Sequence, residues 1–200
     1  GVCVGEAVVC EGNLVCSNGE CVDEIAGGLF FSEYGEGSSQ NKYLEIYNPG
    51  TETVSLENYA LARVTNAPSE LGEYENWSDV FPDNAEIEAG DVYVVAHGSA
   101  DAYILAFADI TFSSLSSGDD GFALVRGTED DYVVLDWIGD FYGNGTGGYA
   151  PWDVCGDGTT KNHTLVRNCD IESGSDWSVS SNIETCQWTV YPQNTWDYVG

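Results

Sequence analysis

The stretch "LFFSEYGEGSSQNKYLEIYNPG", residues 29–50, decides the fold class of this 200-residue chain. Its opening, residues 29–34, is short, apolar and aromatic, which is typical of a buried strand. In residues 42–48, two tyrosines and a glutamate alternate with Leu44 and Ile46. A period of two places the two sets on opposite faces of a strand, and the turn sequence "NPGTET" then ends it. We therefore expect two β-strands in this stretch.

The same kind of pattern recurs along the chain. Further strands are predicted at residues 59–65, 91–97, 121–127, 131–139, 163–168 and 187–192. Thr128, Glu129 and Asp130 separate two of these strands and form a natural hairpin loop. Short strands broken by glycine, asparagine, aspartate and proline predict an all-β sandwich.

Helical character is confined to residues 99–108, "SADAYILAFA". Ser99 can cap a helix there by accepting a hydrogen bond from a backbone amide of its first turn. Tyr103, Leu105 and Phe107 are then expected near its inner side.

Residues 1–26 differ from the rest of the chain because they hold four of the seven cysteines: Cys3, Cys10, Cys16 and Cys21. The segment has few large apolar residues, so we predict two hairpin-like loops that are stapled by disulfides. A zinc site is the alternative, but the cysteine spacings fit zinc-binding pairs poorly. We divide the chain into this segment, residues 1–26, and a sandwich domain, residues 27–200.

The cysteines also predict an oxidising compartment, that is, a secreted or cell-surface protein. The chain contains no methionine, so we expect that an export signal was removed. No apolar run approaches the length of a membrane span, so membrane insertion is not expected.

The charge of the chain is strongly acidic: 34 acids and five bases give a net charge of −29. A nucleic-acid surface needs clustered positive charge, which five scattered bases do not supply. The acidity favours a solvated surface, attraction of divalent cations, or both.

Catalytic equipment is sparse. The two histidines, His97 and His163, lie at a strand end and before a strand. The sequence has no Gly-x-Ser-x-Gly, no His-Glu-x-x-His and no histidine pair for a nuclease metal. With 34 acids, a glycosidase-like carboxylate pair arises by chance and carries little weight. We therefore do not expect an enzyme.

Calcium is the one candidate cofactor, since it binds carboxylate and carbonyl oxygens. Its candidate ligands are Asp119, Asp120, Asp136 and Asp140, which a hairpin of the two central strands would bring near one end. The alternative is that these aspartates make the turn through their own hydrogen bonds. Candidate glycosylation sites are Asn76, Asn144 and Asn162, each in an Asn-x-Ser/Thr triplet.

Several motifs resemble the lamin tail domain family in its bacterial extracellular branch. They are "LFFSEYGEGSSQNKYLEIYNPG" (29–50), "SGDDGFALVRG" (117–127), "LDWIGDF" (135–141), "TKNHTLVRN" (160–168), "DWSVSS" (176–181) and "WTVYPQNTWDYVG" (188–200). The resemblance spans residues 29–200 and implies an immunoglobulin-like sandwich in an extracellular, non-catalytic adhesion or interaction module. Such modules often accompany others, including secreted nucleases. Cys155, Cys169 and Cys186 depart from the family pattern.

An odd number of cysteines leaves one thiol free, or paired outside the chain. We predict a Cys169–Cys186 disulfide because the strands before and after these residues could be neighbours, which leaves Cys155 over. The leader and the odd cysteine favour a structural or adhesive protein, such as a fibre subunit that associates head to tail or with extracellular surface components. The alternative is a glycan- or protein-binding accessory cut from a larger secreted protein, for which a flat row of exposed aromatic rings would be the mark.

Overall fold

The structure is a computed structural model that describes residues 14–17, 20–23, 28–66, 68, 70–115, 117–142 and 150–200, with side chains from residue 28 onward. In the leader, β1 (Leu14–Ser17) pairs antiparallel with β2 (Glu20–Asp23), and Cys16 lies opposite Cys21 in the register. This agrees with a hairpin at that position. The predicted disulfide roles of Cys3 and Cys10 lie outside the described residues, as do the side chains of Cys16 and Cys21.

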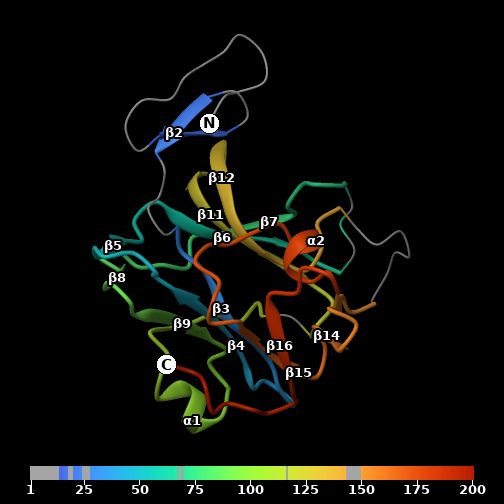
Figure 1. The fold of residues 1–200 in the computed structure, drawn as a ribbon. Helices are drawn as coiled ribbons and strands as arrows, with labels where there is room; N and C mark the ends of the chain where they lie inside the picture. Colours follow the sequence, from blue (N-terminus) through green and yellow to red (C-terminus); the bar gives the residue numbers. More distant parts are fainter. Residues whose placement is uncertain are drawn as a thin grey trace.

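The first layer of the body is a six-stranded sheet in the order β10-β9-β4-β3-β15-β16 (Figure 1). Its strands are β3 (Phe30–Glu36), β4 (Lys42–Tyr47), β9 (Val92–Ala96), β10 (Ile110–Thr111), β15 (His163–Arg167) and β16 (Trp188–Pro192). All neighbours are antiparallel except β9 and β10. Strands from the two ends of the sequence therefore lie side by side in one sheet.

The second layer is a four-stranded antiparallel sheet in the order β12-β11-β6-β7. Its strands are β6 (Tyr59–Val64), β7 (Asn76–Ser78), β11 (Gly121–Thr128) and β12 (Asp131–Ile138). The predicted β11–β12 hairpin is confirmed, with a bulge between Leu124 and Val125.

The main core lies between the two sheets. β4 contributes Leu44 and Ile46, β15 contributes Leu165, and β11 contributes Phe122 and Leu124, all fully buried. These residues alternate along their strands with residues of the outer faces, because successive side chains of a strand point to opposite sides. The prediction of an all-β, immunoglobulin-like sandwich is confirmed.

The outer face of the six-stranded sheet is covered as well, which the sequence did not predict. Tyr43, Val94 and Ala96 form a second buried cluster with Ile104 and Val199. α1 (Ala102–Leu105) and the last residues of the chain supply this cover, and they lie together at one end of the body (Figure 1).

The helix prediction for residues 99–108 is correct in place and wrong in detail. α1 spans one turn, and its cap is Asp101, whose side chain accepts a hydrogen bond from the amide of Tyr103. The fully buried residue is Ile104, and Leu105 packs against the same cluster as predicted, whereas Tyr103 and Phe107 are exposed. A backbone bond from Ala100 to His97 continues the preceding turn through Ser99, so the helix begins later than predicted.

The remaining elements are short. β5 (Val54–Ser55) pairs with β8 (Glu86–Ile87), and β13 (Asp153–Val154) pairs with β14 (Gly158–Thr159). α2 (Trp177–Ser180) packs near β12. None of the helices in the described part of the chain is long and apolar enough to cross a bilayer.

Candidate functional site

A buried ion pair connects the two sheets. Asp136 of β12 is fully buried and accepts hydrogen bonds from the guanidinium Nη2 of Arg167, the amide of Phe31 and the amide of Ser175. Arg167 also donates to the carbonyl of Phe31 at 3.1 Å and to Oε1 of Gln187 at 3.0 Å. We call Asp136 and Arg167 the ionic node.

Aromatic rings enclose the ionic node. The guanidinium carbon of Arg167 lies 4.0 Å from the ring centroid of Trp188 and 5.5 Å from that of Phe30. A buried charge is tolerated only when it is paired and its remaining hydrogen bonds are satisfied. Because the node joins β12 of one sheet to β3 and β15 of the other, it fixes how the two layers pack.

The node engages the carboxylate of Asp136, one of the candidate calcium ligands, within the fold, and calcium binding stays a prediction. Asp120 instead accepts the amide of Asn66 at 2.8 Å and forms an ion pair with Arg63 at 3.7 Å. Asp140 accepts the amide of Tyr142. These bonds agree with the alternative reading, in which aspartates shape turns. Within the described residues, no group of three or more His, Cys, Asp or Glu side chains is placed to hold a metal.

A second acidic feature lies on the outer face of the six-stranded sheet. Glu33 of β3 and Glu45 of β4 are directly opposite in the register and are 2% and 3% exposed. The hydroxyl of Tyr43 donates to Glu33 Oε2, while Ser32 Oγ and the amide of Gly200 donate to Glu45. We call Glu33 and Glu45 the carboxylate pair.

Burial, followed by the neighbouring charge of Glu45, raises the pKa of Glu33 to about 8, although the Tyr43 hydrogen bond opposes the shift. Burial also raises the pKa of Glu45. Oε1 of Glu33 is buried and has no hydrogen-bond partner among the described residues. A protonated Glu33 explains how two carboxyl groups share this covered site, because it removes the repulsion between them.

The raised pKa of Glu33 predicts a pH-dependent stability. In an unfolded chain Glu33 ionises with the ordinary glutamate pKa of 4.5, so between that pH and about 8 the folded state holds more protons and loses stability as pH rises. Replacing Glu33 by glutamine should remove about 2–3 kcal/mol of that loss between about pH 5 and about pH 7. Urea unfolding at both pH values measures it, with the exposed Glu52→Gln variant as control. Equal pH slopes for Glu33→Gln and wild type would contradict the assignment.

A cleft opens beside the carboxylate pair. It has a volume of about 330 Å³, and its walls include Phe30, Tyr47 and Tyr198. Glu45 and Arg167 line it, but their hydrogen bonds to Ser32, Gly200 and the ionic node already occupy them. An adjoining hollow of about 450 Å³ shares Tyr47, Cys169 and Ile171 with it. The cleft has room for an apolar group of a ligand, but its charged side chains are already hydrogen-bonded within the protein.

The two histidines lie at strand ends: His97 directly follows β9, and His163 is the first residue of β15. Nδ1 of His97 accepts the amide of Ser99, and Nδ1 of His163 lies 2.7 Å from the carbonyl oxygen of Lys161. Each ring is therefore engaged by its own loop, as the sequence predicted for strand-end histidines.

Two of the three candidate glycosylation sites are described. Asn76 is half-buried in β7, where its side chain donates to Thr65 Oγ1. Asn162 is exposed, with a φ of 59°, and its side-chain oxygen accepts from Gln193. Asn144 lies outside the described residues. Of the two described sites, Asn162 presents an exposed side chain, and glycosylation at all three sites stays a prediction.

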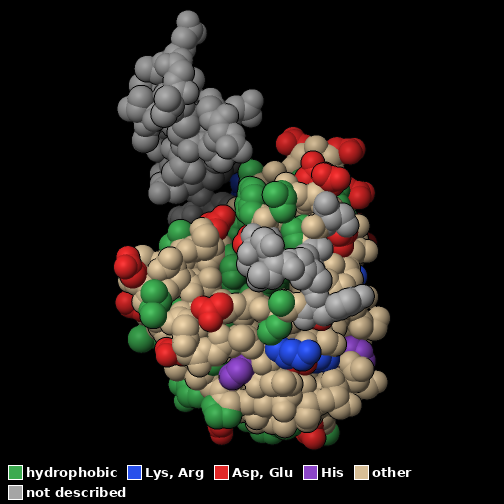
Figure 2. Space-filling view, turned by 90° about the vertical axis from the view of Figure 1, so that its right-hand side faces the viewer, with side chains coloured by type: hydrophobic (Ala, Val, Ile, Leu, Met, Phe, Trp, Pro, Cys, Tyr) green, Lys and Arg blue, Asp and Glu red, His purple; other side chains and the backbone are tan. Residues whose placement is uncertain are grey.

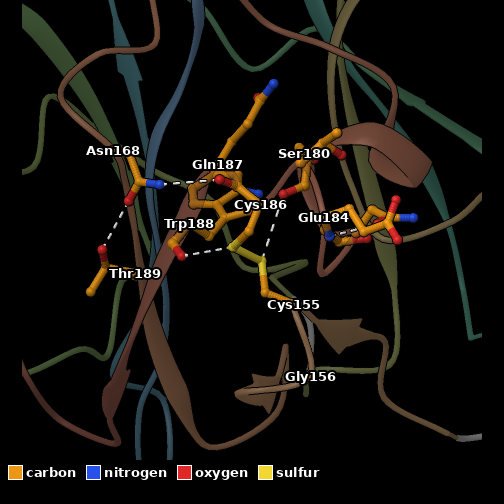
Figure 3. The surroundings of a disulfide bond; sticks show 12 residues. Cys155, Gly156, Asn168, Ser180, Glu184, Cys186, Gln187, Trp188 and Thr189 are labelled. Atoms are coloured by element: carbon orange, nitrogen blue, oxygen red, sulfur yellow. Dashed lines mark hydrogen bonds between the residues drawn. A yellow bond between two sulfur atoms is a disulfide. The ribbon is translucent and has the colours of Figure 1, made fainter.

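The predicted Cys169–Cys186 disulfide is wrong. Cys186 is bonded to Cys155, with 5.5 Å between the Cα atoms (Figure 3). Among the cysteines whose side chains are described, Cys169 is free and exposed. The strands β15 and β16 are neighbours, as expected, but β15 ends at Arg167 and a turn carries Cys169 away.

The same turn explains the new pairing. Asn168 holds it by donating to the carbonyl of Cys186 and accepting from Thr189 (Figure 3). A backbone bond from Cys155 to Ser181 then brings Cys155 beside Cys186.

The outer face of the four-stranded sheet carries a cluster of aromatic side chains. Tyr74, Trp77 and Tyr132 are half-buried, and their ring centroids lie 5.6, 5.7 and 5.3 Å apart in pairs. Planes that cross at 58–73° mean that the rings meet edge to face. We call these three residues the aromatic face.

Small residues in the middle strands make room for these rings. Ala62 of β6 and Ala123 of β11 are paired in the register, with Trp77 on one side and Trp137 on the other. Both alanines are only 1% exposed, so the aromatic side chains of the two edge strands cover them. The sequence analysis named neither the aromatic face nor the ionic node.

These features define a class of protein, an immunoglobulin-like β-sandwich. Its buried ion pair joins the two sheets, and the aromatic face on one outer surface is partly exposed. The Lamin Tail Domain family matches residues 23–139, more than half of the chain, and the chain belongs to this family, a non-catalytic β module. The match ends at the close of β12, although β15 and β16 complete the sheet. No curated protein matches the chain significantly.

Proposed function

We propose that the chain is an extracellular, non-catalytic structural module that adheres to other molecules through the surface of its sandwich. The observation that carries this proposal is the aromatic face, since half-exposed tyrosine and tryptophan rings are the groups that most often anchor protein interfaces. The Cys155–Cys186 disulfide supports a non-cytoplasmic location.

The fibre form of this proposal is head-to-tail association of copies. Edge strands such as β7 and β16 leave backbone groups available to a strand of a neighbour, and the leader hairpin is a strand donor of suitable size. The net charge of −29 opposes such contacts at low ionic strength. Association that strengthens with salt is therefore expected.

Sedimentation velocity and electron microscopy of unreduced native material test this function. We expect particles larger than the single 21.5 kDa chain, and a larger share of them in about 0.15 M salt than in about 0.01 M salt. Dispersed monomers at both salt concentrations would contradict the fibre form. Adhesion is tested by passing the chain over isolated extracellular surface material. A chain that is not retained on this material would contradict the adhesive function as well.

The second candidate is a binding accessory of a larger secreted protein, such as a nuclease. The aromatic face favours it too, but a glycan that stacks on aromatic side chains favours coplanar rings, whereas these rings are tilted against one another by 58–73°. We therefore favour a protein ligand over a glycan for this surface.

A further inference from the structure

The surroundings of the aromatic face are acidic. The exposed carboxylate of Asp79 accepts a hydrogen bond from the Trp77 indole at 2.8 Å, and Glu129 lies 3.3 Å from the hydroxyl of Tyr74. Glu73 and Glu75, on either side of Tyr74, are exposed too. Partial burial and the charge of Glu73 raise the pKa of Tyr132. The rings therefore lie within a rim of negative charge.

Four of the five bases of the chain have partners outside the aromatic face. Lys42, Arg63 and Arg167 form ion pairs with Glu36, Asp120 and Asp136. Arg126 interacts with Tyr59, a residue of the main core. In the part of the chain that the structure describes, both cation–π contacts come from Arg167, on Phe30 and Trp188. The aromatic face thus keeps its π-surfaces for a cation from elsewhere.

Figure 2 shows an excess of acidic over basic side chains on one side of the molecule. Acidic side chains are scattered over this view, from its upper right to its lower edge, whereas the visible basic side chains are fewer and gather mainly in its lower half. An anionic partner would meet repulsion over most of such a surface, and a cationic partner would be attracted to it.

The ring contacts restrict how a cation binds. Centroids 5.3–5.7 Å apart leave no gap between the rings, so a ligand lies over the cluster rather than inside a cage. Arginine suits this arrangement better than lysine, because its planar guanidinium stacks on a ring while its N–H groups reach the carboxylates around it.

We infer that the aromatic face is a docking site for an arginine-rich segment of another extracellular protein. This inference rests on the proposed adhesive function. A second copy of this chain is a poor occupant, since three of its five bases are already in ion pairs. The partner is therefore a basic protein, and cation–π contacts with Tyr74, Trp77 and Tyr132 select it.

Calorimetric titration of the full, unreduced chain tests the site. The probe is an acetylated peptide of about eight alternating glycine and arginine residues, compared with an analogue in which uncharged citrulline replaces each arginine. About 0.3 M sodium chloride screens the general attraction to an acidic protein. We expect the arginine peptide to bind at least about tenfold more tightly than the citrulline peptide.

Variants locate the binding. Trp77→Leu and Tyr132→Leu each remove an aromatic ring but keep apolar bulk. The double variant Asp79→Asn, Glu129→Gln removes two carboxylates and leaves the rings intact. Each of these three variants should bind the arginine peptide at least about fivefold more weakly than wild type. Tyr103→Leu, an exposed tyrosine on α1, is the matched control and should stay within about twofold.

Three results would overturn the inference. They are equal affinity for the two peptides, equal losses in Tyr103→Leu and the face variants, and binding of a neutral cello-oligosaccharide in place of the arginine peptide. Particle size by sedimentation is measured separately, so failure of this site is distinguishable from failure of the adhesive function.

Discussion

Replacing Asp136 by alanine is expected to lower the free energy of unfolding by about 3–5 kcal/mol. The substitution leaves the buried guanidinium of Arg167 without its carboxylate and removes the acceptor of the amides of Phe31 and Ser175. Breaking one side of a buried pair is costly because the other charge stays in a medium that solvates it poorly. Equilibrium unfolding in urea, monitored by tryptophan fluorescence, measures the loss.

Asp131→Ala is the matched control, because Asp131 is an exposed aspartate of the same strand. Its cost should stay within about 0.5 kcal/mol. If Asp136→Ala costs no more than this control, Asp136 and Arg167 do not join the sheets as described.

Removing the disulfide with Cys155→Ala and Cys186→Ala together should destabilise the chain by about 3–4 kcal/mol. The bond closes a loop with a sequence separation of 31, and without it the unfolded chain regains that conformational freedom. Thermal or urea unfolding of the unreduced proteins compares the variant with wild type.

Cys169→Ala is the control for this change, because Cys169 is exposed and unpaired. It should leave stability within about 0.5 kcal/mol of wild type. Peptide mapping under non-reducing conditions gives a second readout: a fragment that joins Cys169 to Cys186 would contradict the pairing.

The strands were predictable because their signal is local. Alternation in residues 42–48 separates Leu44 and Ile46 from the outward set, and these two residues do face the main core. The sequence could not show that Tyr43 and Glu45 are also buried, because the cover comes from α1 and the end of the chain. Burial of both faces is a property of tertiary packing, and alternation alone does not reveal it.

The ionic node left a signal that the sequence analysis did not use. Leu165 faces the core, and Arg167 follows it by two positions, so a period of two places a guanidinium inside the sandwich. A buried arginine requires a carboxylate, and Asp136 alternates in the same way with Ile138. The partner itself, 31 residues away in sequence, is set by how the sheets pack.

The cysteine pairing failed for a related reason. If β15 and β16 continued beyond Arg167 and Trp188, residues 169 and 186 would lie opposite one another, but the turn after Arg167 carries Cys169 away. Of the three cysteines outside the leader, the free one is therefore Cys169 rather than Cys155. Turn geometry beyond a strand end is decided by side-chain bonds such as those of Asn168, which alternation does not encode.

Oxidative footprinting of aromatic side chains tests the central claim most directly, because it reports which surface is covered when the module is in its native association. Hydroxyl-radical labelling of native material is compared with labelling of the dispersed chain. The account predicts that Tyr74, Trp77 and Tyr132 become protected, while Tyr103 on α1 stays reactive. Protection of Tyr103 with unchanged labelling of the aromatic face would contradict it.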